Sequence, residues 1–179
     1  MADLTIQDLP FARYLSEATI QARVAELAQA LNADYRDRQP LMIVVLNGAF
    51  LFAADLVRHL RIEPEIQFIR ITTYGNTMSS SETAQILLGL EVEVEDRDVI
   101  IVEDIVDSGY TTDFFIGHLN QQSPASVRLM TLLFKPDNFT RSHRPDYIGF
   151  DIPPDFVVGY GMDYAQQGRE LRDIYKLRT

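Results

Sequence analysis

The sequence predicts an α/β fold in which helices flank a parallel, twisted sheet. Short apolar runs alternate along the chain with segments of helical periodicity, as expected when each strand is followed by a helix. Several runs are apolar at every position, which is typical of strands buried on both faces of a parallel sheet. No linker, repeat or low-complexity tract divides the chain, so we expect one domain over residues 1–179.

The composition limits the classes of function. With 179 residues, 46% of them hydrophobic, the chain can bury a core, and the absence of cysteine excludes disulfides and thiolate chemistry. A formal charge of −10 opposes general nucleic-acid binding, so an anionic metabolite would need backbone N–H groups, placed cations or metal ions. The first residues do not resemble a signal peptide and the longest apolar run is too short to span a membrane, so we expect a cytoplasmic protein.

The first part of the chain predicts a helix, a strand and a second helix. Ser16 is a suitable N-cap, and apolar residues then recur at 4-3-4 spacing over Ile20–Leu31, which indicates one face of an amphipathic helix. The run Leu41–Leu46 is continuously apolar and rich in β-branched residues, which predicts a buried strand. Asn47-Gly48 ends this strand, and a helix is expected over Phe50–Leu60.

The middle of the chain predicts strands on either side of a polar segment. Glu65–Ile71 and Gln85–Leu90 are the expected strands, and Thr72–Thr83 between them is rich in Ser and Thr, which predicts a mobile loop. A further strand, Asp98–Glu103, ends in acidic residues. The remaining expected elements are a helix over Thr111–Gln122, strands at Ser126–Phe134, Tyr147–Phe150 and Phe156–Tyr160, and an irregular tail.

Ligands of open parallel sheets bind beyond the carboxyl ends of the strands, and the most informative motif lies at such a place. The apolar run that ends in Glu103-Asp104 continues into Asp107 and then into the hydroxyl-rich loop Ser108–Thr112, which opens a helix. Backbone N–H groups and hydroxyls at a helix N-terminus favour a phosphate, and two adjacent acids could hold ribose hydroxyls or hydrated magnesium. A capped turn alone would explain the loop, but three acids in an apolar segment are costly to bury without a ligand.

The motif VEDIVDSGYTT closely resembles the signature with which type I phosphoribosyltransferases bind 5-phosphoribosyl-1-pyrophosphate (PRPP). Four other segments resemble the hypoxanthine-guanine branch of that family, in the same order: LNGAFLFAADLVR, TTYGNTMSSS, TLLFKP and DFVVGYGMDY followed by Arg169. The resemblance implies the type I phosphoribosyltransferase fold, with a small hood from the C-terminal and N-terminal segments over the site. It implies purine salvage: magnesium-dependent transfer of the phosphoribosyl group to hypoxanthine or guanine, giving IMP or GMP and pyrophosphate.

The resemblance assigns a role to each polar residue of the signature. Glu103 and Asp104 would contact the ribose hydroxyls and their magnesium. Asp107 would lie beside purine N7 as the general base. The 5′-phosphate would bind to the loop formed by Ser108, Gly109, Tyr110, Thr111 and Thr112.

Two other segments would bind pyrophosphate and metal. Leu46, Asn47 and Gly48 would bind pyrophosphate through backbone amides, in a loop that in this family often contains a non-proline cis peptide. Relatives often carry Lys at the position of Asn47, so a side-chain cation is missing there. Asp163 would hold a second magnesium and Arg169 would reach the pyrophosphate; without the resemblance, these two are an ordinary exposed acid and base.

The purine would be recognised by residues from three segments. Lys135 would donate to the exocyclic O6, Phe156 would stack on the base, Val157 would read its edge through the main chain, and Ile105 would pack on the opposite face. Taken alone, Lys135 followed by proline indicates an exposed turn, and Phe156 with Val157 indicates a core strand. A Lys donor favours a 6-oxopurine over adenine, whereas the residues leave the choice among hypoxanthine, guanine and xanthine open.

Thr73 and Tyr74 lie in the polar loop, which in the family closes over the site. Composition alone indicates a flexible surface segment, but a transferase must keep water from a cationic ribosyl centre, which gives a lid a physical purpose.

A different class of function shares the PRPP signature, namely PRPP-sensing regulators that bind RNA. The net charge of −10, the absence of a basic stripe and the base-reading residues oppose it. The expected partners are therefore PRPP, a 6-oxopurine base and further copies of the chain in a homodimer or homotetramer, with no nucleic acid and no membrane.

Overall fold

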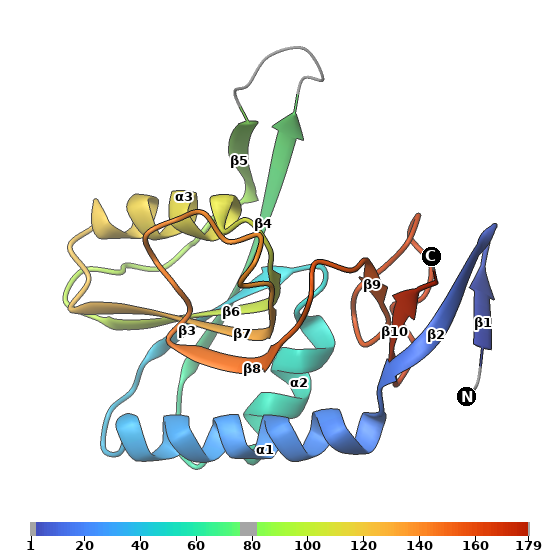
Figure 1. Ribbon diagram of the computed structural model, residues 1–179. Coiled ribbons are helices and arrows are strands. Elements are labelled where there is room, and N and C mark those ends of the chain that lie inside the picture. Colours follow the sequence, from blue (N-terminus) through green and yellow to red (C-terminus); the bar gives the residue numbers. More distant parts are fainter. Residues whose placement is uncertain (1–2, 76–81, 179) are drawn as a thin grey trace.

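The computed structural model describes residues 3–75 and 82–178, which form two sheets (Figure 1). Six strands form the main sheet, in which β4 and β5 are antiparallel and every other neighbouring pair is parallel. In spatial order these strands are β5 (Glu82–Leu88), β4 (Glu65–Gly75), β3 (Leu41–Leu46), β6 (Asp98–Val106), β7 (Ser126–Phe134) and β8 (Tyr147–Asp151). The predicted α/β fold with a parallel sheet is therefore confirmed.

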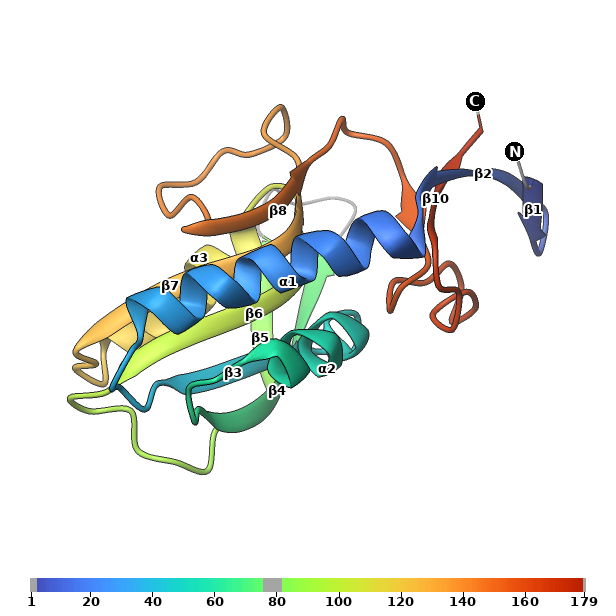
Figure 2. The ribbon, with the colours of Figure 1, turned by 90° about the horizontal axis from the view of Figure 1, so that it is seen from below.

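Helices cover both faces of the main sheet. Helices α1 (Glu17–Asp34) and α2 (Phe50–His59) lie on one face, and α3 (Tyr110–Asn120) lies on the other, as Figures 1 and 2 show. The central strands are buried on both faces because successive side chains alternate between the two helical layers: Val44 packs toward α1 and α2, and Ile43 packs toward α3. This arrangement explains why the sequence of β3 is apolar at every position.

The first helix begins as its sequence predicts. The Ser16 side chain accepts a hydrogen bond from the Thr19 backbone N–H at 3.2 Å, so Ser16 caps α1. The apolar residues at 4-3-4 spacing are all buried against the main sheet. Within the described residues, no helix is both long enough and apolar enough to cross a bilayer.

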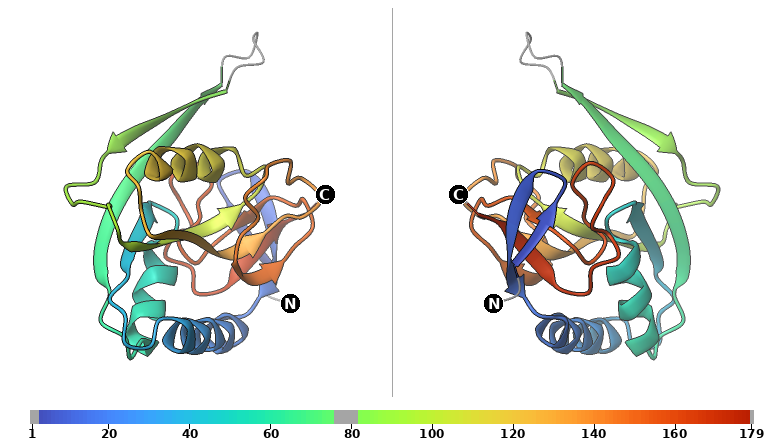
Figure 3. Two further views of the ribbon diagram at one scale, coloured as in Figure 1. Left: turned by 90° about the vertical axis from the view of Figure 1, so that its left-hand side faces the viewer. Right: turned by 90° about the vertical axis from the view of Figure 1, so that its right-hand side faces the viewer.

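A second, antiparallel sheet lies beside the carboxyl ends of the main strands and forms a hood (Figures 1 and 3). Its strands are ordered β1-β2-β10-β9, where β1 is Asp3–Ile6, β2 is Leu9–Leu15, β10 is Ile174–Leu177 and β9 is Val157–Val158. The sheet joins both ends of the chain, as the expected hood does. The expected irregular tail is wrong, because Ile174–Leu177 pairs with β2 on one side and β9 on the other.

Several element boundaries also differ from the prediction, and the strand expected over Phe156–Tyr160 is only Val157–Val158. Both ends of the loop expected over Thr72–Thr83 are strand, because β4 continues to Gly75 and β5 begins at Glu82. The backbones of Thr73 and Tyr74 pair with Ala84 and Thr83, so both residues belong to a β-ladder and not to a loop. Thr and Tyr both favour strands, so the ladder agrees with the intrinsic preference of these two residues, and the polar composition of the whole segment was the misleading signal. The rest of the expected loop, residues 76–81, lies outside the described residues.

Candidate active site

The ends of β6 and β7 bring the expected general base and the expected purine donor together. The two strands are parallel and in register to Val106 and Phe134, and the Lys135 N–H donates to the Val106 carbonyl at 3.0 Å. Asp107 and Lys135 follow as neighbours, and the Lys135 ammonium lies 2.7 Å from Oδ2 of Asp107. Lys135 is buried and Asp107 is half-exposed, so the sheet holds a cation whose counter-ion faces the solvent-accessible side.

Two further acids, Glu103 and Asp104, lie four and three residues before Asp107, inside β6, which is longer than the predicted strand. Glu103 is only 7% exposed, and burial raises its pKa well above the usual glutamate range, with the neighbouring charge of Asp104 adding to the effect. Burial also raises the pKa of Asp104, although a hydrogen bond with Glu103 and the charge of Arg169 oppose that shift. Both carboxyls are therefore costly to ionise unless a cation or a donor reaches them.

The turn after β3 packs directly on Asp104. The peptide bond between Leu46 and Asn47 is cis, as the resemblance implies. A Cβ atom at Gly48 would collide with the Asp104 carboxylate, and the Gly48 carbonyl lies against Gly161 from the hood. Only glycine permits this approach, so the expected pyrophosphate loop lies between an acid of the main sheet and the hood.

The expected phosphate loop forms a tight turn that opens α3. Gly109 is the N-cap residue and has a φ of 82°, in the left-handed region that favours glycine. Ser108 accepts a hydrogen bond from the Tyr110 N–H at 3.3 Å, and the buried Thr112 hydroxyl donates to the Gly109 carbonyl at 3.0 Å. The hydroxyl of Thr112 is thus occupied, and Thr111 is left as the hydroxyl without a hydrogen bond to any described residue.

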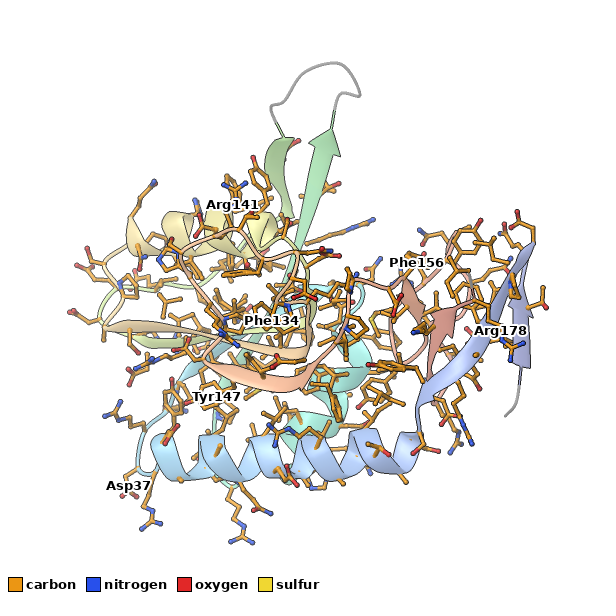
Figure 4. All side chains as sticks on the ribbon, in the orientation of Figure 1. Asp37, Phe134, Arg141, Tyr147, Phe156 and Arg178 are labelled. Atoms are coloured by element: carbon orange, nitrogen blue, oxygen red, sulfur yellow. The ribbon has the colours of Figure 1, made fainter. Side chains whose placement is uncertain are left out.

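The expected purine-binding residues line a cavity of about 370 Å³ between the main sheet and the hood. Phe156, labelled on the hood in Figure 4, is 44% exposed and rests against the rings of Phe11 and Tyr164 at centroid distances of 6.3 and 6.0 Å. Val157 is buried in β9. The residues that line the cavity are Asn47, Gly48, Asp104, Ile105, Asp107, Lys135, Phe156, Val157, Met162, Asp163 and Arg169.

The hood places an ion pair opposite the acids of β6. Arg169 lies 2.6 Å from an oxygen of Asp163 and also donates to the Gly161 carbonyl at 2.8 Å. The second oxygen of Asp163 accepts from the Gln166 N–H at 2.7 Å. The expected second metal ligand is therefore engaged with the expected pyrophosphate ligand.

The donor set at this place fits a magnesium ion. Carboxylate oxygens are the ligands that magnesium prefers, and the buried, reluctantly ionised Glu103 and Asp104 would be stabilised by a nearby cation. In residues 3–75 and 82–178, however, no group of three or more His, Asp or Glu side chains is gathered as a preformed metal cage. A hard cation that keeps several waters and shares the phosphates of a substrate matches such a partial set.

Two site residues were not predicted. Asn138 donates from Nδ2 to Oδ1 of Asp107 at 2.7 Å, and Met162 lines the cavity. Asn138 could have been found from the Lys-Pro-Asp-Asn turn, because proline at the second position folds the fourth residue back beside the first. Met162 lies in a turn of the hood whose position depends on contacts that are distant in sequence.

A second and larger hollow of about 890 Å³ lies at the opposite end of the main sheet, near the C-terminal ends of α1 and α2. Ligands of parallel sheets bind at the carboxyl ends of the strands, not at this end. One of its polar side chains, Asn32, already has partners, because its oxygen accepts from the Arg61 N–H and its amide donates to the His59 carbonyl. The smaller cavity is therefore the candidate active site.

Comparisons with known proteins agree with this geometry. The phosphoribosyl transferase domain family matches residues 12–165. A hypoxanthine-guanine phosphoribosyltransferase of Mycobacterium tuberculosis is 44% identical over 166 residues, which cover 89% of this chain and 82% of that protein. One from Bacillus subtilis is 41% identical over 164 residues, covering 92% and 91%.

Solved structures give the same result. A crystal structure of a hypoxanthine-guanine phosphoribosyltransferase from Bacillus anthracis has a TM-score of 0.89 and 36% identity, and the match covers 93% of this chain and 98% of that one. The fold, the order of the motifs and these similarities show that the chain belongs to the phosphoribosyltransferase family, in its hypoxanthine-guanine branch.

Proposed function

We propose that this chain transfers the phosphoribosyl group of PRPP to hypoxanthine or guanine, giving IMP or GMP and pyrophosphate. The observation that carries the proposal is the pairing of Asp107 with Lys135 in a cavity whose other wall contains Phe156 and Val157. A carboxylate, an ammonium and an aromatic face are the groups needed to manage the ring proton, the O6 and the plane of a 6-oxopurine.

In the reaction, the bond between C1′ of PRPP and its pyrophosphate oxygen breaks as a purine ring nitrogen bonds to C1′. Lys135 would donate to O6, which relieves its ion pair with Asp107 and leaves Oδ2 of that carboxylate able to accept the ring proton. Phe156 and Ile105 would hold the base in line with C1′, because both line the same cavity. Val157 would present its main chain to the base edge.

The phosphate groups would be bound mainly by the backbone. Ser108–Thr112 offers amides at the N-terminus of α3 to the 5′-phosphate, and the turn at Asn47 and Gly48 offers amides to the pyrophosphate. Arg169 would supply the cationic side chain for the leaving group. A chain with a formal charge of −10 needs such local attraction, since its overall field repels polyanions.

Glu103 and Asp104 would hold magnesium together with the ribose hydroxyls, and Asp163 would hold a second ion once Arg169 turns toward pyrophosphate. When bound, magnesium would neutralise charge on the leaving pyrophosphate.

Three further expectations belong to this proposal. The segment that begins at Thr73 and Tyr74, where β4 pairs with β5, would close over the bound substrates. The chain would act in the cytoplasm as a homodimer or homotetramer. Light scattering of the purified protein measures the number of copies directly.

The experiment that tests the proposed function is an assay with PRPP, magnesium and each of hypoxanthine, guanine, xanthine and adenine. We expect turnover of hypoxanthine and guanine and hardly any of adenine, because adenine presents an amino group to the Lys135 donor. Comparable activity with adenine, or none with any 6-oxopurine, would refute the proposal.

A further inference from the structure

Asn138 approaches Asp107 because of the turn that follows β7. Pro136 has the backbone geometry required at the second position of a β-turn, and the Asn138 N–H closes the turn by donating to the Lys135 carbonyl at 3.2 Å. The chain thus folds back, so that the first and fourth residues of the turn both face Asp107. Lys135 donates to Oδ2 and Asn138 donates to Oδ1, each at 2.7 Å.

The turn is fixed to the phosphate loop on its far side. Phe139 packs edge-on against the buried ring of Phe134, at a centroid distance of 5.2 Å, and lies under Gly109, where a Cβ atom would collide with it. The next N–H, from Thr140, donates to the Ser108 carbonyl at 3.2 Å. Asn138 is therefore held by its own N–H bond to the Lys135 carbonyl on one side and by the anchored Phe139 and Thr140 on the other, which limits its freedom to leave Asp107.

The orientation of the Asn138 amide follows from the charge of its partner. A carboxylate beside a buried ammonium accepts hydrogen bonds and cannot donate them, so only the NH₂ group of Asn138 can face Oδ1. Asn138 is not among the residues that line the cavity, whereas Asp107 is. The Asn138 side chain can therefore act on a bound purine through Asp107, the cavity residue to which its amide donates.

We propose that Asn138 is a positioning residue, which holds Oδ1 of Asp107 so that Oδ2 stays on the Lys135 side, where it meets the purine. The inference rests on the proposed function, in which Asp107 accepts the ring proton. With Oδ1 fixed, the carboxylate cannot rotate when Lys135 turns to the purine O6.

The test compares three variants at one position. Asn138→Gln keeps the amide donor on a longer stem, Asn138→Leu keeps the shape without the donor, and Asn138→Asp adds a second negative charge. We expect kcat to decrease in the order wild type, Gln, Leu, Asp. The Leu variant should be roughly tenfold slower, as expected when one hydrogen bond to a charged group is lost, while the KM for PRPP changes by less than about twofold.

The pH profile separates positioning from simple structural support. Without the donor, the acidic limb of kcat/KM should move to higher pH, and it should move further in the Asp variant because like charges disfavour ionisation. His143→Gln is the matched control: it replaces the imidazole of the same segment, whose Nδ1 lies 2.6 Å from Asp113, without touching Asp107. That variant should keep the wild-type kcat and pH profile.

The outcomes distinguish this inference from the proposed function. If wild-type protein transfers the phosphoribosyl group and Asn138→Leu keeps its kcat and pH profile, the positioning role is wrong and the proposed function stands. A lower melting temperature with unchanged kinetics would likewise assign Asn138 to stability alone. Should the Leu variant fail to fold, the Gln and Asp variants decide, because equal kcat and pH profiles in these two would contradict the proposal.

Discussion

The two halves of the candidate site are built in different ways. The sheet half consists of Glu103, Asp104, Asp107 and Lys135, which come from the adjacent strands β6 and β7 and their ends. The hood half consists of Phe156, Val157, Asp163 and Arg169, which come from the residue before β9, from β9 and from the turns that follow it. The first is fixed by the register of two buried parallel strands, and the second by an antiparallel sheet that joins both ends of the chain.

The backbones of the two halves show the same contrast. Each half pairs its own charged groups: Lys135 with Asp107 and Glu103 with Asp104 in the sheet half, and Asp163 with Arg169 in the hood half. The backbones differ, because the turns of the hood contain left-handed residues, which include the non-glycine residues Tyr160, Ala165 and Gln166, whereas β6 and β7 contain none. We infer that the sheet half is preorganised for chemistry and the hood half for binding.

Asp107→Asn should give the largest effect and confine it to catalysis. The variant keeps the shape of the side chain, and the Asn138 amide can rotate to accept from the new NH₂ group, so the fold and PRPP affinity should change little. Because the new residue cannot take a proton, kcat should fall by roughly 10²–10⁴ and the acidic limb of the pH profile should disappear. Steady-state kinetics over a pH series measure both. A variant with near-normal kcat would show that Asp107 only supports the turn.

Arg169→Met should weaken pyrophosphate binding in the reverse reaction. The change removes the cation that lies 2.6 Å from Asp163, and we expect the KM for pyrophosphate to rise by roughly 10- to 100-fold, since hydrogen bonds between charged groups are the strong ones. Arg172→Met is the matched control, because Arg172 is 80% exposed and pairs with Glu17 outside the cavity. Equal effects of the two substitutions would remove Arg169 from the hood half of the site.

Phe156→Leu should weaken purine binding without a loss of stability. The ring is 44% exposed, and a lost aromatic stack is worth about 1 kcal/mol, so the KM for hypoxanthine should rise roughly fivefold while kcat and Tm stay near wild type. Phe11→Leu, at a fully buried ring of the same cluster, should instead lower Tm. If Phe156→Leu lowers Tm as strongly, its ring supports the hood and does not bind the purine.

Glu103→Gln should raise stability by a small amount when metal is absent. The buried carboxyl has a pKa well above the usual range, so its cost begins above the ordinary glutamate pKa, where the unfolded chain ionises, and grows until the folded-state pKa is passed. Removal of that cost should raise Tm by about 2–4 °C per kcal/mol at pH 8, and the gain should shrink as the pH falls toward 4. Calorimetry with EDTA measures it; a lower Tm at pH 8 would mean that the ionised carboxylate stabilises the fold.

The same contrast explains how much could be predicted from the sequence. The sheet half depends on local rules: apolar runs give parallel strands, and the residues that follow these strands lie at one edge of the sheet, which predicted a ligand site at the end of β6. The place of Lys135 in that site was implied only by the resemblance, because Lys135 followed by proline indicates an exposed turn when taken alone, whereas the structure buries it beside Asp107. The cis peptide at Asn47 was implied only by the resemblance.

The hood depends on pairing between β2 and β10, whose residues are separated by most of the chain. Neither strand has the continuous apolar run that identifies β3 or β6, because one face of this small sheet is exposed. The contact of Asn138 with Asp107 was also missed, although the turn that creates it is visible in the sequence. The signal lay in turn chemistry and not in hydrophobic periodicity.

The most direct test of the division of labour is one set of initial-rate measurements with PRPP, magnesium and hypoxanthine on wild type, Asp107→Asn and Phe156→Leu. The account predicts that Asp107→Asn loses kcat by roughly 10²-fold or more with a near-normal KM, while Phe156→Leu raises the KM for hypoxanthine with a near-normal kcat. If Asp107→Asn changes only the KM for hypoxanthine, or Phe156→Leu loses kcat as severely as Asp107→Asn does, the two halves do not divide chemistry from binding and the account is wrong.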